Sequence, residues 1–179
     1  MRTQSLDYIL DQVRDTVSSI DDAAQDRLID EIVKAKKIFI YGAGRSGLVG
    51  QLFAVRLVQM GLDVHFVGDM TTPIIGSEDL AILISNTGET MSAVQTANIA
   101  RRLGCFVVCV TSSAHNKLAH ASNLVVEVRH HSKEDPKYAP LGTIFEDSVS
   151  LFFDSLVPSI MAKLDMNEDD MRRRHAIWV

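Results

Sequence analysis

The chain has 179 residues, of which 46% are hydrophobic and 23% are charged, and its formal net charge is −5 at pH 7. This length suits one domain over residues 1–179, and an acidic balance without a dense basic cluster argues against nucleic acid as a partner. No stretch reaches the roughly 20 apolar residues of a membrane span, and the N-terminus lacks a signal-peptide pattern, so we expect a cytoplasmic protein with no membrane contact.

The first 36 residues predict two helices. Apolar side chains recur at helical spacing over about residues 3–19, which indicates the first helix. Asp21 and Asp22 can cap a second helix, whose apolar face includes Leu28 and Ile32. We therefore expect a helical N-terminus over residues 1–36.

Beyond residue 36, short apolar runs alternate with helical patterns. The runs that predict buried strands are KIFIYG, DVHFVG, LAILIS, CFVVCVT and NLVVEV. Helical patterns over about 46–61 and 90–103, and a short helical turn at HNKLAHAS, lie between them. Strands that are apolar throughout, with helical crossovers, are typical of a parallel sheet covered on both faces. The sequence thus predicts an α/β fold, a flavodoxin-like three-layer α-β-α sandwich with a five-stranded parallel sheet.

A polar loop over residues 129–141 precedes a long helix over about 143–164. Pro158 is expected to kink or interrupt this helix, and a charged tail follows over residues 165–179. The apolar stripe of the helix could pack in the core or at a subunit interface: Leu151, Phe152, Phe153, Leu156 and Ile160. Together with the N-terminal helices, the stripe indicates a homo-oligomer without fixing the number of subunits.

Both cysteines, Cys105 and Cys109, fall on the strand CFVVCVT. Four residues of extended chain separate them by about 13 Å, which is too far for a disulfide. Further ligands for a metal are not visible nearby. We therefore expect two buried, reduced thiols and no metal site.

The strand KIFIYG ends in GAGRSG, residues 42–47, which matches the G-x-G-x-x-G fingerprint of dinucleotide sites. Asp63 or Asp69 could supply the acidic residue that contacts the ribose in such a site. However, the chain has no length for a separate substrate domain, and a dinucleotide leaves the next loop unexplained. We expect the glycines to serve close approach of strand and helix, with Ser46 directed at a phosphate.

A second unusual loop, SNTGET at residues 85–90, follows the strand LAILI. Hydroxyls and free backbone N–H groups at a helix N-terminus form a good anion site, and Gly88 permits a tight turn. The alternative is a simple helix cap by Thr87 or Thr90. The density of donors favours phosphate binding by this loop: Ser85, Asn86, Thr87, Gly88, Glu89 and Thr90, with Ser46, and with Gly44 and Arg45 as possible substrate contacts.

GAGRSG followed by SNTGET resembles the SIS (sugar isomerase) domain family, which binds phosphosugars. The usual second-loop pattern of that family is S-x-S-G-x-T, and here Thr87 replaces the second serine and keeps a hydroxyl. Within the family the chain is similar to the 6-phospho-3-hexuloisomerases in its small size, in PLGTIFED at 140–147, and in Arg174-His175-Ala176. It departs from their usual asparagine at the next position, which is Ile177.

The resemblance implies interconversion of D-arabino-hex-3-ulose 6-phosphate and fructose 6-phosphate through an enediolate, in the ribulose monophosphate pathway of formaldehyde fixation. It also implies a homotetramer that needs neither a metal nor an organic cofactor. Two alternatives stay open. The chain could be another phosphosugar aldose–ketose isomerase, or a phosphosugar-binding module that does not turn its ligand over.

The resemblance places the catalytic base at Glu146, in the first turn of the long helix. On the residues alone, a glutamate in that position more often complements the helix dipole. Glu89 is the rival base, but a carboxylate inside a phosphate loop would repel the ligand unless it points away, so we interpret it as solvent-facing or structural. His175 is expected to assist as a proton shuttle, on a tail that could reach the site of a neighbouring subunit.

Overall fold

The computed structural model describes residues 2–130 and 135–175. Its centre is a sheet of five parallel strands in the spatial order β2-β1-β3-β4-β5. The strands are β1 (Ile38–Gly42), β2 (Val64–Phe66), β3 (Leu80–Ile84), β4 (Phe106–Thr111) and β5 (Leu124–Glu127). The predicted five-stranded parallel sheet is confirmed, although β2 is shorter than the run DVHFVG suggests.

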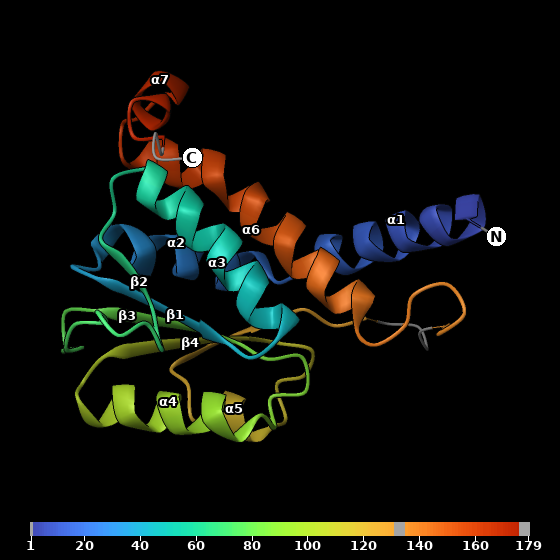
Figure 1. The fold of residues 1–179 in the computed structure, drawn as a ribbon, viewed down its shortest axis with the longest axis horizontal. Coiled ribbons are helices and arrows are strands. Elements are labelled where there is room, and N and C mark those ends of the chain that lie inside the picture. Colours follow the sequence, from blue (N-terminus) through green and yellow to red (C-terminus); the bar gives the residue numbers. More distant parts are fainter. Residues whose placement is uncertain (1, 131–134, 176–179) are drawn as a thin grey trace.

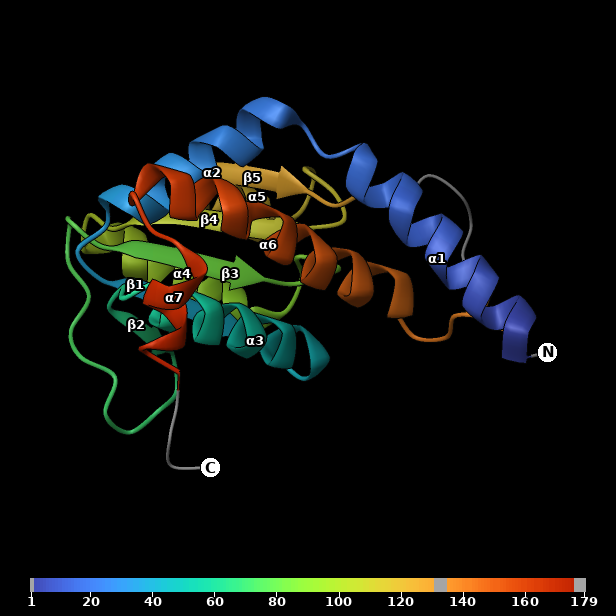
Figure 2. The ribbon, with the colours of Figure 1, turned by 90° about the horizontal axis from the view of Figure 1, so that it is seen from above.

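Helices cover both faces of this sheet (Figure 1). One face carries α2 (Asp22–Lys34), α3 (Arg45–Gln59) and α6 (Thr143–Lys163), and the other carries α4 (Met91–Arg102) and the short α5 (Lys117–His120). α1 (Arg2–Ser18) packs along α6 and extends beyond the sheet (Figure 2). This is the predicted three-layer sandwich with a helical N-terminus. No helix within the described residues is long and apolar enough to cross a membrane.

The long helix α6 supplies much of the core between the sheet and the outer helices. Phe153 stacks on Phe53 of α3 with 4.1 Å between ring centroids, and Phe152 is fully buried beside it. Burying each such ring stabilises the fold by roughly 1.5–3 kcal/mol. Leu156 and Ile160 are buried as well, whereas Leu151 is exposed. Most of the predicted stripe therefore packs in the core of the chain rather than at a subunit interface.

Two features near the C-terminus differ from the prediction. α6 runs without interruption through Pro158 to Lys163. Pro158 and Asp154 both lie on the exposed face of α6, so water can satisfy the Asp154 carbonyl that loses its partner. In the charged tail a further helix, α7 (Glu168–Arg172), begins with a capping box between Asn167 and Asp170.

The strand order places a topological switch between β1 and β3. The chain passes from β1 outward to β2, then returns to β3 on the other side of β1. Gly42, the last residue of β1, lies in register with Ile84, the last residue of β3. Ligands of open parallel sheets bind outside the carboxyl ends of the strands at such a switch. The segments that follow β1 and β3 are therefore the first place to look for a site.

Both cysteines are buried and neither forms a disulfide, as the sequence predicts. Burial raises the pKa of the Cys105 thiol to about 12 and that of the Cys109 thiol to about 11. The reactive thiolate is therefore scarce at pH 8. We expect neither thiol to react with a disulfide reagent in the native protein at that pH, and both to react in urea. Rapid labelling of either thiol without denaturant would contradict this placement.

Candidate active site

Three segments far apart in the chain converge at the carboxyl edge of the sheet. They are the turn into α3, the loop over residues 85–90, and the first turn of α6. The side chain of Arg45 is ion-paired with Glu146. A Cβ added to Gly142 would lie only 3.0 Å from the side-chain amide nitrogen (Nδ2) of Asn86, so the start of α6 also contacts the loop. The structure thus brings together most of the residues that the sequence singled out.

The glycines of GAGRSG allow β1 and α3 to approach closely. A Cβ on Gly47 would overlap the carbonyl oxygen of Gly42, and a Cβ on Gly42 would lie 2.7 Å from the Gly47 nitrogen. The predicted role of these glycines in strand–helix packing is confirmed. Gly44 is the N-cap residue of α3, and Arg45 and Ser46 form its first turn, with Ser46 half-buried.

The loop over residues 85–90 is folded around the buried Ser85 hydroxyl. This hydroxyl accepts a hydrogen bond from the Gly88 N–H at 3.2 Å and lies 3.1 Å from the Thr90 hydroxyl. Thr90 occupies the N-cap position of α4, but its side chain makes no capping hydrogen bond there. The Thr87 hydroxyl accepts from the Glu89 N–H at 3.2 Å. The loop is therefore more than a side-chain cap on α4.

Glu89 belongs to the loop, but its carboxylate is directed at α5. It pairs with the Lys117 ammonium at 2.7 Å and accepts from the Lys117 N–H at 3.3 Å. These interactions with Lys117 lower the pKa of Glu89. About half of the side chain is exposed, so the interpretation of Glu89 as solvent-facing or structural is confirmed.

Glu146 lies at the start of α6 with its carboxylate covered by Arg45. The Glu146 side chain is only 11% exposed, whereas that of Arg45 is 63% exposed. The hydrogen bond and the negative charge of Glu146 raise the pKa of Arg45. Because the Arg45 side chain is largely exposed, its guanidinium can release the Glu146 carboxylate when another anion competes for it. A hollow of about 310 Å³ adjoins the pair, lined by Arg45, Leu48, Val49, Leu52, Glu146, Asp147 and Ser150.

Asp147 is a site residue that the sequence reasoning missed. Burial raises the pKa of its carboxyl, Arg45 opposes this effect, and the charge of Glu146 adds to it. A carboxylate directly after a candidate base was the available signal, but adjacent helix positions point to different faces, so the sequence alone did not place it in the same hollow.

The raised pKa of Asp147 predicts a pH-dependent stability. Below its ordinary pKa of 3.8 the carboxyl is protonated in both folded and unfolded chains. As the pH rises from 3.8 through the higher pKa of the folded chain, the unfolded chain ionises more readily than the folded chain, so the free energy of unfolding falls. Asp147→Asn cannot ionise. We expect the variant to have a higher free energy of unfolding than the wild type at pH 7, with the difference shrinking near pH 3.5, as measured by urea denaturation. An equal difference at both pH values would contradict the assignment.

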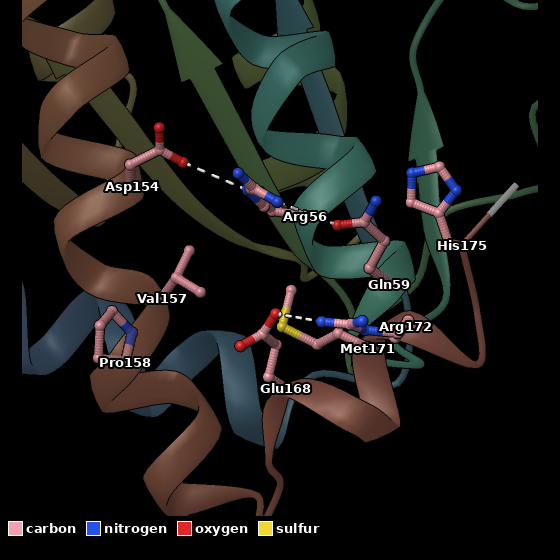
Figure 3. Close-up of a pocket in the computed structure, with 9 residues that line it drawn as sticks. All are labelled: Arg56, Gln59, Asp154, Val157, Pro158, Glu168, Met171, Arg172 and His175. Atoms are coloured by element: carbon pink, nitrogen blue, oxygen red, sulfur yellow. Dashed lines mark hydrogen bonds and ion pairs between the residues drawn. The ribbon is translucent and has the colours of Figure 1, made fainter.

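His175 is not part of this cluster within one chain. It lines a separate hollow of about 590 Å³ between α3, α6 and α7, with Arg56, Gln59, Asp154 and Pro158 among its neighbours (Figure 3). Pro158 follows Glu146 by twelve helical residues, or about 18 Å along α6. Figure 1 likewise shows α7 at the opposite end of α3 and α6 from their N-termini. An assisting role for His175 therefore stays a prediction that requires a neighbouring subunit. Ala176 and Ile177, also singled out in the sequence, lie outside the described residues.

Within residues 2–130 and 135–175, no three His, Cys, Asp or Glu side chains gather closely enough to hold a metal ion. The groups that the site offers for chemistry are instead a carboxylate pair, a guanidinium, hydroxyls and backbone N–H groups. Such a set can hold a phosphate and can move a proton at a carbon next to a carbonyl.

Comparisons with known proteins agree with this fold. The family model described as the SIS domain matches residues 31–154. A 3-hexulose-6-phosphate isomerase of Methanocaldococcus jannaschii is 39% identical over 84% of this chain and 81% of its own length. A protein of the same name from Bacillus subtilis is 31% identical over 97% of both chains. A Methanococcus jannaschii structure, whose authors inferred the function of 3-hexulose-6-phosphate isomerase, superposes with a TM-score of 0.85 at 35% identity, covering 95% of this chain and 98% of its own.

Proposed function

The chain belongs to the SIS domain family and is an isomerase, and on that premise we propose that it interconverts D-arabino-hex-3-ulose 6-phosphate and fructose 6-phosphate. The observation that carries the proposal is the convergence of the hydroxyl-rich loop with the start of α6, where Arg45 pairs with Glu146. Relatives that are 39% and 31% identical are named 3-hexulose-6-phosphate isomerase. We extend the proposal to the ribulose monophosphate pathway of formaldehyde fixation and to a homotetramer.

The phosphate binds to the loop over residues 85–90, with Ser46 and the first turn of α3. The N–H groups at the starts of α3 and α4 carry the partial positive charge of the helix dipoles. A phosphate held there leaves the carbon chain free to extend toward Glu146. Arg45, in the first turn of α3 and paired with Glu146, is the side chain best placed to contact the bound substrate between these two segments.

In the reaction, the Glu146 carboxylate takes the proton from C2 of the 3-ketose. The electron pair of the broken C2–H bond forms a C2–C3 double bond, and negative charge develops on the C3 oxygen. The Arg45 guanidinium stabilises that enediolate. After the proton on the C2 oxygen moves to the C3 oxygen, Glu146 returns its proton to C3 and the carbonyl stands at C2. Substrate and product are isomers, so no redox partner is consumed.

A coupled assay tests the proposal. Ribulose 5-phosphate, formaldehyde and a hexulose-phosphate synthase supply the substrate, and phosphoglucose isomerase with NADP-linked glucose 6-phosphate dehydrogenase reports fructose 6-phosphate as NADPH. We expect NADPH formation to require both the synthase and this protein. A folded protein that gives no signal would refute the assignment. Turnover of other phosphosugars would then identify a different aldose–ketose isomerase, and binding without turnover would identify a sensing module.

A further inference from the structure

The turn between β4 and α5 backs the 85–90 loop, and its central side chain is Asn116. This residue is buried, with 7% of its surface exposed. Its amide oxygen accepts from the Ala119 N–H at 2.8 Å and so caps α5. Its amide nitrogen donates to the Thr111 hydroxyl at 2.9 Å and to the Ser113 carbonyl at 2.6 Å. A helix cap needs only the oxygen, so the two donated bonds require another explanation.

The first contact between Asn116 and the loop is steric. Gly88 has a φ of +64°, and a Cβ on it would overlap the Asn116 side-chain amide. The Gly88 carbonyl accepts from the Leu118 N–H at 3.0 Å. Asn116 thus lies flat against the loop backbone at the one residue that has no side chain, and it prevents this part of the loop from moving toward α5.

The second contact is a relay through Thr111. Because the Thr111 hydroxyl accepts from Asn116, its single proton is available to the Asn86 carbonyl, 3.1 Å away. The hydroxyl and the N–H of Ser112 donate to the same carbonyl, at 2.7 and 3.0 Å. In a trans peptide the C=O and the following N–H point in opposite directions. The relay therefore turns the Thr87 N–H away from the β4–α5 turn, and among the described residues this N–H donates to no backbone carbonyl.

We propose that Asn116 is a positioning residue for substrate phosphate: it fixes the Asn86 carbonyl and the Gly88 backbone so that the loop N–H groups face the ligand, without touching the ligand itself. This inference rests on the proposed function for the nature of the ligand. It extends the site to a side chain outside both GAGRSG and SNTGET. The hydrogen bond donated to Thr111 and the packing contact with Gly88 carry the effect.

The test compares Asn116→Ser with the wild type and with Asn123→Ser. Serine retains the capping oxygen at position 116 but loses both donors and the bulk that packs on Gly88. Asn123 is the matched control, because its side chain also bonds backbone, the Val107 N–H at 2.9 Å, but at the amino edge of the sheet. The quantities measured are KM for the phosphosugar, the inhibition constant and calorimetric Kd of inorganic phosphate, and kcat.

For Asn116→Ser we expect KM and both phosphate constants to rise in parallel by about tenfold, with kcat within about twofold of the wild type. Asn123→Ser should change none of them. Thr111→Val, which removes only the relay hydroxyl, should raise the same constants by a smaller factor, and it replaces Asn116→Ser if that variant does not fold. Unchanged phosphate constants in folded variants, or a loss of kcat alone, would overturn the proposal.

The phosphate measurement separates this inference from the proposed reaction. A wild type that binds inorganic phosphate but gives no product refutes the isomerase, while the phosphate Kd of Asn116→Ser still decides the role of Asn116. A wild type that binds neither phosphate nor phosphosugar would overturn both.

Discussion

Glu146→Gln is expected to lower kcat by about 10²–10⁴-fold, the usual contribution of a general base, while fructose 6-phosphate still binds. Glutamine has the same shape and can still accept the hydrogen bond that Arg45 donates to position 146. It cannot take a proton from carbon. The Glu146 side chain is only 11% exposed, and because glutamine has nearly the same size, the change should leave the packing of α6 intact. The coupled assay measures kcat, and calorimetry with fructose 6-phosphate measures binding.

Glu89→Gln is the matched control for that prediction. It removes the rival carboxylate, whose partner is Lys117 and not Arg45. We expect turnover within a few-fold of the wild type, because Glu89 is directed at α5. If Glu89→Gln abolishes turnover and Glu146→Gln does not, the two assignments must be exchanged. Loss of binding and turnover together in Glu146→Gln would show that Glu146 holds the site and does not act as its base.

Gly88→Ala is expected to reduce phosphosugar affinity by at least about tenfold. A left-handed backbone costs a non-glycine residue about 1–2 kcal/mol, and here the new methyl group also overlaps Asn116. The loop must move to relieve the overlap, and with it the N–H groups that bind phosphate. A tenfold loss of affinity corresponds to about 1.4 kcal/mol, and we attribute it to the displaced N–H groups, because backbone strain is present in both the free and the bound protein and lowers stability instead. Calorimetric titration with fructose 6-phosphate and inorganic phosphate measures it.

Gly104→Ala separates backbone strain from damage to the loop. Gly104 has a φ of +82°, and a Cβ there would lie 3.1 Å from the Cβ of Ser77, near the amino edge of the sheet. This variant should lose stability and keep its affinity. Adding Asn116→Ser to Gly88→Ala should recover part of the lost affinity, because the serine makes room for the methyl group. Equal losses of affinity in Gly88→Ala and Gly104→Ala would contradict a local effect at the loop.

The sequence was sufficient for the sheet because apolar runs such as LAILI can be buried only where both faces are covered. It also located the two glycine-containing loops, because each directly follows a buried strand. Pro158 misled the prediction, since local propensity does not show that the affected carbonyl faces water. α7 was missed, although Asn167 and Asp170 form a recognisable capping box.

The parts of the site that could not be predicted depend on tertiary contacts. Asn116 before KLAH is a visible helix-cap signal, but its contact with Gly88 exists only once β4 and α4 have been packed together. The position of His175 is a similar case. The sequence showed its side-chain chemistry, whereas its separation from Glu146 follows from the length of α6: Glu146 lies at the start of this helix, and His175 lies near its C-terminal half.

The convergence of distant segments has a consequence for biosynthesis. Arg45 and Glu146 are 101 residues apart, and α6 begins only after all five strands have been made. Because α6 also supplies much of the core over one face of the sheet, that face is incompletely covered until this last long helix has been made and docks. The docking of α6 therefore completes the core and delivers the proposed base, Glu146, in the same late step.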